Sequence, residues 1–126
     1  MTKINPVGLL FIVFTIVFTV IGQLMVKKGT LEVGASPAHL ALLPRFVWRV
    51  FTNLYVLIGL VCAVCAAVAW AVAVSRVNLS IAYPFMGLAI VLVLAFSGML
   101  FGEVVSMGRW IGVLIVCVGL MVAARS

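Results

Sequence analysis

The chain has 126 residues, of which 67% are hydrophobic and 8% are charged. Soluble domains have about 25% charged residues, so this chain cannot cover a water-facing surface, and its many apolar residues exclude a disordered protein. The net charge of +6 is concentrated near the ends of apolar segments. This placement favours contact with anionic lipid head groups, so we expect membrane lipids, and no nucleic acid, as partners.

Four apolar segments are long enough to cross a membrane, because a bilayer core of about 30 Å requires about 20 helical residues. These segments are 7–26, 54–74, 79–101 and 104–124. They take up most of the chain, so we predict an all-α integral membrane protein with a single domain over residues 1–126. The first segment is too long for the apolar core of a cleaved signal peptide and ends in two lysines, so we expect it to be retained.

The first segment contains a line of polar residues. Thr15, Thr19 and Gln23 follow one another at steps of four residues, which keeps them near one helix face, and Lys27 continues the series. Polar groups in a membrane helix face protein or water rather than lipid. The line is therefore either the lining of a transport path or a set of hydrogen-bonding groups that hold neighbouring helices together.

The long first loop is expected to run from about Lys27 to Asn53 and to begin with glycine, serine and proline residues typical of turns. From 38 to 52, apolar residues recur at helical spacing, with Arg45, Arg49 and Thr52 on other faces. A helix of about 14 residues is too short to span a bilayer. We therefore predict an interfacial helix at head-group depth in this loop.

The second segment is lined with alanine and glycine, which allow close approach of membrane helices. Trp70 is interpreted as a packing or interface residue, with stacking on a substrate as the alternative. Arg76 and Asn78 form the expected tight turn to the third segment. That segment begins near Tyr83 and Pro84, where the missing backbone donor of proline is tolerated.

Nothing in the sequence supports catalysis. Cys62-x-x-Cys65 lies inside an apolar run without a second ligand pair, so we interpret it as small apolar filler rather than a redox or zinc site. We find no nucleophile–base pair and no phosphate-binding glycine loop. The expectation is a protein that is not an enzyme and has no catalytic residues, no cofactor and no metal.

Glu103, between the third and fourth segments, is one of only two acidic residues. Arg109 lies in the same short loop, so one interpretation is a local ion pair that holds the loop, and the other is a gating or proton-coupling role for Glu103. The fourth segment contains Gly108, Gly112 and Gly119, whose spacing predicts a helix-pairing face at a dimer interface.

Three short motifs, in their order and spacing, resemble the small multidrug resistance family within the drug/metabolite transporter superfamily. The motifs are Gly22-Gln23-Leu24 with Lys27, Ile81-Ala82-Tyr83-Pro84, and Trp110-x-Gly112-Val113. The resemblance covers essentially the whole chain and is closest to the small subunits that flip aminoarabinose-phosphoundecaprenol in Gram-negative bacteria. It implies a four-helix transporter of the bacterial inner membrane.

One departure from the family separates two possible functions. Its drug-exporting members have a glutamate in the middle of the first helix that binds protons and cations in turn. The drug exporters share a Val-Ile-Gly motif with this chain, and aligning it with Val20-Ile21-Gly22 places Thr19 at the position of that glutamate. No carboxylate lies inside any of the four segments. A buried acid is the group that exchanges a proton for a cation at low dielectric, so proton-coupled export of cationic drugs is disfavoured.

The sequence therefore favours a transporter or flippase for a polyprenyl-phosphate-linked sugar or a related lipid. Basic residues at helix ends are expected to bind the phosphate, and polar and aromatic residues to line the path of the sugar. The candidates for phosphate binding are Lys27, Lys28, Arg76 and Arg109. The candidates for the lining are Thr15, Thr19, Gln23, Trp70 and Tyr83.

Two alternatives remain: an exporter of small cationic compounds, and a non-transporting membrane subunit of a glycosyltransferase system. The latter predicts that the polar residues of the first helix tolerate apolar replacement together. One bundle of four helices fills its own centre with side chains and leaves little room for a polar head group. We therefore expect a homodimer, or a heterodimer with a similar small subunit.

Overall fold

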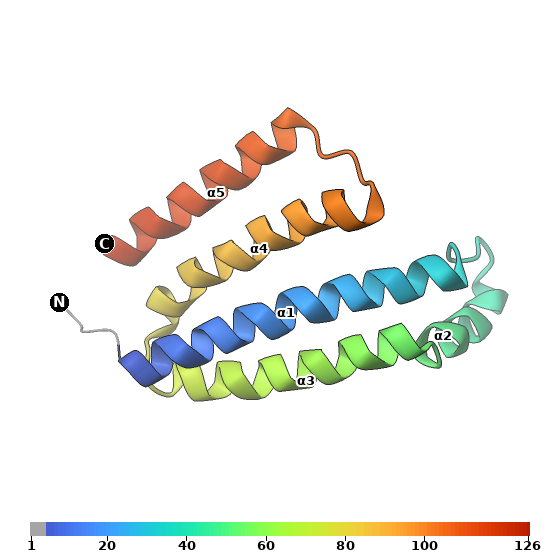
Figure 1. The fold of residues 1–126 in the computed structure, drawn as a ribbon, viewed down its shortest axis with the longest axis horizontal. Coiled ribbons are helices and arrows are strands. Elements are labelled where there is room, and N and C mark those ends of the chain that lie inside the picture. The colour runs from blue at the N-terminus through green and yellow to red at the C-terminus, as the bar shows by residue number, and fades with distance from the viewer. Residues whose placement is uncertain (1–4) are drawn as a thin grey trace.

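A computed structural model describes residues 5–126 of the chain, which form helices joined by short turns and contain no strand (Figure 1). The elements are α1 (Pro6–Val33), the 3-10 helix η1 (Leu40–Leu42), α2 (Leu43–Phe51), α3 (Leu54–Val74), α4 (Leu79–Phe101) and α5 (Met107–Arg125). Four of them, α1, α3, α4 and α5, are long and apolar enough to cross a membrane. The predicted all-α fold with four such helices is confirmed, and the chain is a multi-pass membrane protein.

Helix α1 is longer than predicted. Its start is capped by Asn5, whose Oδ1 accepts a hydrogen bond of 2.9 Å from the Val7 backbone N–H, and Gly34 (φ 100°) ends it. The expectation that the loop begins at Lys27 is wrong, because the helix continues through both lysines to Val33. Packing explains the extension: Gly29 is buried, and a Cβ at this position would lie 2.5 Å from Cγ2 of Val56 in α3.

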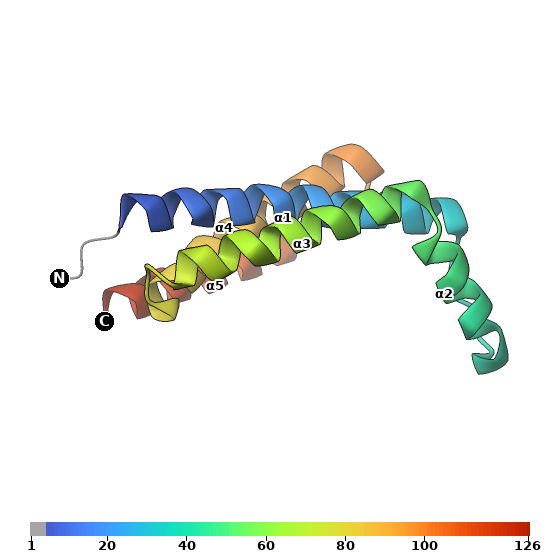
Figure 2. The ribbon, with the colours of Figure 1, turned by 90° about the horizontal axis from the view of Figure 1, so that it is seen from below.

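The first loop contains a short helix, as predicted, although α2 occupies only part of the range 38–52. Figure 2 shows α2 turned steeply away from the long axis of α1 and α3. Asn53 then caps α3 by accepting a 3.0 Å hydrogen bond from the Tyr55 N–H, while its Nδ2 donates to Glu32 Oε2 at 3.1 Å. Since Glu32 belongs to the last turn of α1, this amide ties the end of α1 to the start of α3.

Helices α1 and α3 lie side by side (Figure 1), and two glycines of the pair face each other in close contact. A Cβ at Gly22 would lie 3.0 Å from the carbonyl oxygen of Gly59, and a Cβ at Gly59 would lie 2.7 Å from that of Gly22. Small residues permit such backbone contact in membrane helices, where dispersion rather than the hydrophobic effect drives association. The backbones of α1 and α3 are therefore in close contact at these glycines.

Gly59→Leu should separate this pair and lower the free energy of unfolding by about 1–3 kcal/mol, the usual cost of overpacking. The new side chain would collide with Val26 Cγ2, which lies 2.6 Å from the Cβ position, as well as with the Gly22 carbonyl. Ala67→Leu, on the exposed face of the same helix, is the matched control. Equal midpoints of thermal unfolding for both variants in detergent would show that the helices do not touch at Gly59.

The buried core connects α1, α3 and α4 in the half of the bundle near the α3–α4 turn. Its members are Ile12, Ile16, Val20, Ala73, Val77, Ala82 and Ala89. Helix α5 packs only on α4 among the described elements and lies on the side of α4 away from α1 (Figure 1). Consequently, one face of α5 touches the rest of the chain, and the other is left open.

Candidate functional site

A cleft of about 730 Å³ lies between α1 and α4, with Leu120 of α5 at its edge. On α1 the cleft begins at Thr19, next to the last core residue Val20, and extends to Lys27. Most of its wall is apolar. The polar residues that line it are Thr19, Gln23, Lys27, Tyr83, Ser97 and Glu103.

The polar line on α1 divides into two parts with different surroundings. Thr19, Gln23 and Lys27 line the cleft, because steps of four residues keep them on nearly one face. Thr15 is absent from the lining and only 3% exposed, and its hydroxyl donates a 2.7 Å hydrogen bond to the Phe11 carbonyl of the preceding turn. The structure thus places Thr15 in the core, with its hydroxyl satisfied within its own helix.

One ion pair crosses the cleft at its end. The Lys27 Nζ lies 3.4 Å from Glu103 Oε1, and the two side chains are 46% and 43% exposed. The expected local pair between Glu103 and Arg109 is therefore wrong. Gly102 (φ 65°) ends α4 in the left-handed conformation, after which Glu103 begins a non-helical segment, while Arg109 already belongs to the first turn of α5. Glu103 instead bridges to a residue far away in the sequence.

The other candidate phosphate-binding residues do not gather around Lys27. The Lys28 ammonium lies 4.5 Å from the centroid of the Tyr55 ring, a cation–π contact with α3. Arg76 is in the α3–α4 turn, at the opposite end of the bundle, and Arg109 does not line the cleft. Among the four predicted residues, Lys27 alone lines the cleft.

Two aromatic residues form the other end of the site. Trp70 of α3 and Tyr83 of α4 make an edge-to-face contact, with ring centroids 5.3 Å apart and an interplanar angle of 69°. Such pairs orient both rings. Tyr83 lines the cleft, whereas Trp70, which was also predicted to line it, contacts Tyr83 without lining the cleft.

Ser97 is a cleft residue that the sequence prediction missed. It lies on the same stripe of α4 as Tyr83, since the lining residues between them recur at steps of three and four residues. Its hydroxyl donates a 3.1 Å hydrogen bond to the Leu94 carbonyl. This helical spacing, applied from Tyr83 onward, is the signal that would have found it.

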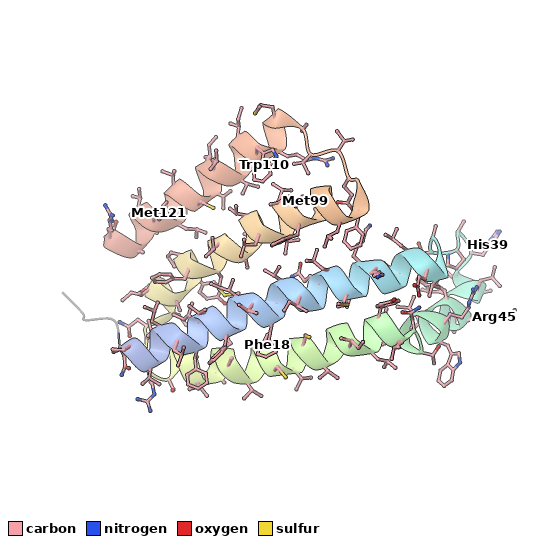
Figure 3. All side chains as sticks on the ribbon, viewed as in Figure 1. Phe18, His39, Arg45, Met99, Trp110 and Met121 are labelled. Atoms are coloured by element: carbon pink, nitrogen blue, oxygen red, sulfur yellow. The ribbon has the colours of Figure 1, made fainter. Side chains whose placement is uncertain are left out.

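The glycines predicted to pair helices lie on the open side of α5. Gly108, Gly112 and Gly119 are exposed, and a Cβ at Gly112 or Gly119 would meet nothing within 4 Å. Figure 3 shows α5 side chains that point away from the other helices, and it places His39 and Arg45 at the far end of the molecule with α2. The α5 glycines therefore have no packing role within residues 5–126.

Within the same described range, no group of three or more His, Cys, Asp or Glu side chains is placed to hold a metal ion. Cys62, Cys65 and Cys117 are free thiols. The polar chemistry of the cleft therefore comes from hydroxyl, amide and ammonium groups, together with a single carboxylate.

Comparison with known proteins gives one informative similarity. The chain is 25% identical over 111 residues to the probable 4-amino-4-deoxy-L-arabinose-phosphoundecaprenol flippase subunit ArnE of Aeromonas hydrophila, an alignment covering 88% of this chain and 91% of that protein. No family model matches the chain. No solved structure matches it either. A distant similarity over nearly the full length of both chains supports a small membrane transporter.

Proposed function

We propose that the chain is a subunit of a flippase that moves a polyprenyl-phosphate-linked sugar across the bacterial inner membrane. The observation that carries this proposal is a membrane-embedded cleft with hydroxyl and amide groups along its length and a lysine at its end. The similar protein of Aeromonas hydrophila, a probable flippase subunit for a sugar on phosphoundecaprenol, points in the same direction.

Each part of such a lipid has a matching surface in the cleft. The sugar hydroxyls would form hydrogen bonds with Thr19, Gln23 and Tyr83, and the phosphate would bind the Lys27 ammonium through a charge-assisted hydrogen bond. The polyprenyl tail would stay in the bilayer beside the apolar wall. The cleft volume of about 730 Å³ lies within the range of known small-molecule sites, roughly 300–1,000 Å³.

The positions of the acidic residues favour this substrate over a cationic drug. Glu32 is in the last turn of α1, and Glu103 follows the end of α4, so neither lies within the central part of a membrane-spanning helix. An exchange of protons for cations would need a carboxylate deep in the cleft, where desolvation tunes its proton affinity. We infer transport of an anionic lipid without chemical conversion.

The functional unit in this proposal is a dimer, formed with a second copy or with a similar small subunit. The cleft is open on one side, and the glycines of α5 leave a flat face without contacts inside the chain. Close pairing through Gly108, Gly112 and Gly119 would bury that face. A second subunit that also covers the open side of the cleft would enclose a path for the head group.

Site-specific cross-linking tests whether the lipid occupies the cleft. A photoreactive amino acid at Ile90, which lines the cleft, should react with a radiolabelled polyprenyl-phosphate sugar, and excess unlabelled lipid should suppress the reaction about tenfold or more at roughly 10 Kd. The same amino acid at Val68, 61% exposed on α3, is the control for random contact with lipid. Equal labelling and equal insensitivity to competitor at both positions would contradict the proposal.

A further inference from the structure

At the end of the cleft, an ion pair joins a helix that packs on α3 to a non-helical segment. Lys27 lies within a continuous helix, between two contacts of that helix with α3, the Gly22–Gly59 contact and the contact of Gly29 with Val56. Glu103 lies in a non-helical segment between α4 and α5, directly after Gly102. Since α5 contacts only α4 among the described elements, the pair with Lys27 is the polar link from this segment to α1.

The ion pair is weak enough for another anion to replace the Glu103 carboxylate on Lys27. Both side chains are nearly half exposed, and the separation of 3.4 Å is longer than a tight charge-assisted hydrogen bond of about 2.7–2.9 Å. Exposed pairs of this kind contribute little stability, because water screens the charges and ordering two long side chains costs entropy. An anion that reaches Lys27 through the cleft can therefore displace the Glu103 carboxylate.

We propose that Glu103 is a positioning residue that holds the Lys27 ammonium in the cleft of the empty protein and yields it to the phosphate of the substrate. This inference rests on the proposed function, since it assumes that the ligand in the cleft is a phosphate-bearing lipid. When phosphate replaces carboxylate on Lys27, the segment between α4 and α5 loses its polar link to α1, while α4 stays packed on α1 through the core. Arrival of an anionic ligand thus opens the end of the cleft, whereas a neutral lipid leaves it closed.

Two measurements test the exchange: the distance between two spin labels and the affinity for polyprenyl phosphate. Spin labels at Leu31 and Met99, both exposed, report the distance between the end of α1 and the end of α4 in a background with Cys62, Cys65 and Cys117 replaced by alanine. The protein is placed in phosphatidylcholine nanodiscs and titrated with a short polyprenyl phosphate. The corresponding uncharged polyprenol serves as the neutral probe.

In the wild type, polyprenyl phosphate should increase the mean distance between the two labels and broaden its distribution. Polyprenol should change neither. Glu103→Gln should show the longer distance without any ligand and bind polyprenyl phosphate about two- to fivefold more tightly, because the competing carboxylate is gone. Glu32→Gln is the matched control: this acid also lies at the end of a helix but bonds Asn53, so neither distance nor affinity should change.

The outcomes separate this inference from the proposed function. A wild type that binds polyprenyl phosphate, together with a Glu103→Gln variant of unchanged distance and affinity, would overturn the exchange and leave the proposed function intact. Lengthening by polyprenol equal to that by polyprenyl phosphate would also overturn it. A wild type that fails to bind polyprenyl phosphate would refute the proposed function, and the exchange with it.

Discussion

Replacing Lys27 with glutamine should lower the translocation rate of a polyprenyl-phosphate sugar by about ten- to a hundredfold at substrate concentrations below saturation. The substitution removes the ammonium at the end of the cleft and therefore a hydrogen bond between charged groups worth about 1.5–3 kcal/mol. Glutamine keeps a polar side chain of moderate length, so the loss reflects charge rather than an empty space. The rate is measured in proteoliposomes by following, over time, the fraction of sugar that becomes inaccessible to a membrane-impermeant oxidant.

Lys28→Gln is the control for this variant. Lys28 has the same charge and neighbours Lys27 in sequence, but its ammonium lies over the Tyr55 ring and outside the cleft. We expect its translocation rate to stay within about twofold of the wild type, because an exposed cation–π contact is worth only about 0.5–1 kcal/mol. Similar losses in both variants would mean that the lysines act through general attraction of anions and not through a defined site.

Replacing Gly112 or Gly119 with leucine should weaken dimerisation by about five- to a hundredfold without unfolding the chain. A Cβ at either position meets nothing within 4 Å in the chain itself, so a leucine there fits the isolated subunit. In a dimer paired through this face, the same leucine would overpack the interface at a cost of about 1–3 kcal/mol. Mass measurement in lipid nanodiscs gives the oligomeric state, and thermal unfolding checks the fold.

Val118→Leu is the matched control for the glycine variants. Val118 is 56% exposed on the same helix but lies off the line of glycines, so its replacement should leave the dimer unchanged. Complete dimerisation of both glycine variants would show that α5 pairs through another face or does not pair. An active species with the mass of a single chain would refute the dimer itself.

The membrane helices were predictable because apolar length alone decides them, but their ends were not. Two adjacent lysines suggested that the first helix ends at Lys27, whereas the helix continues to Val33. The deciding contact, Gly29 against Val56, joins residues of different helices, and nothing local in the sequence reveals it. Lysine also has a good helix propensity, so the helix has no local reason to stop before Gly34.

The same limit applies to the site. Helical spacing correctly grouped Thr19, Gln23 and Lys27 on one face, because that arrangement depends only on the geometry of a single helix. The burial of Thr15 depends on where α4 meets α1, which spacing does not fix. Likewise, closeness in sequence makes Arg109 one possible partner of Glu103, whereas the actual partner, Lys27, is brought close only by the packing of separate helices.

The decisive measurement is translocation of the lipid by the purified protein. The protein is purified with any small subunit that accompanies it and reconstituted with a radiolabelled polyprenyl-phosphate sugar. Sugar inaccessible to the external oxidant should then equilibrate between leaflets far faster than in empty liposomes, and the Lys27→Gln variant should remove most of this acceleration. Equal rates for protein-containing and empty liposomes would show that the protein does not move this lipid between leaflets.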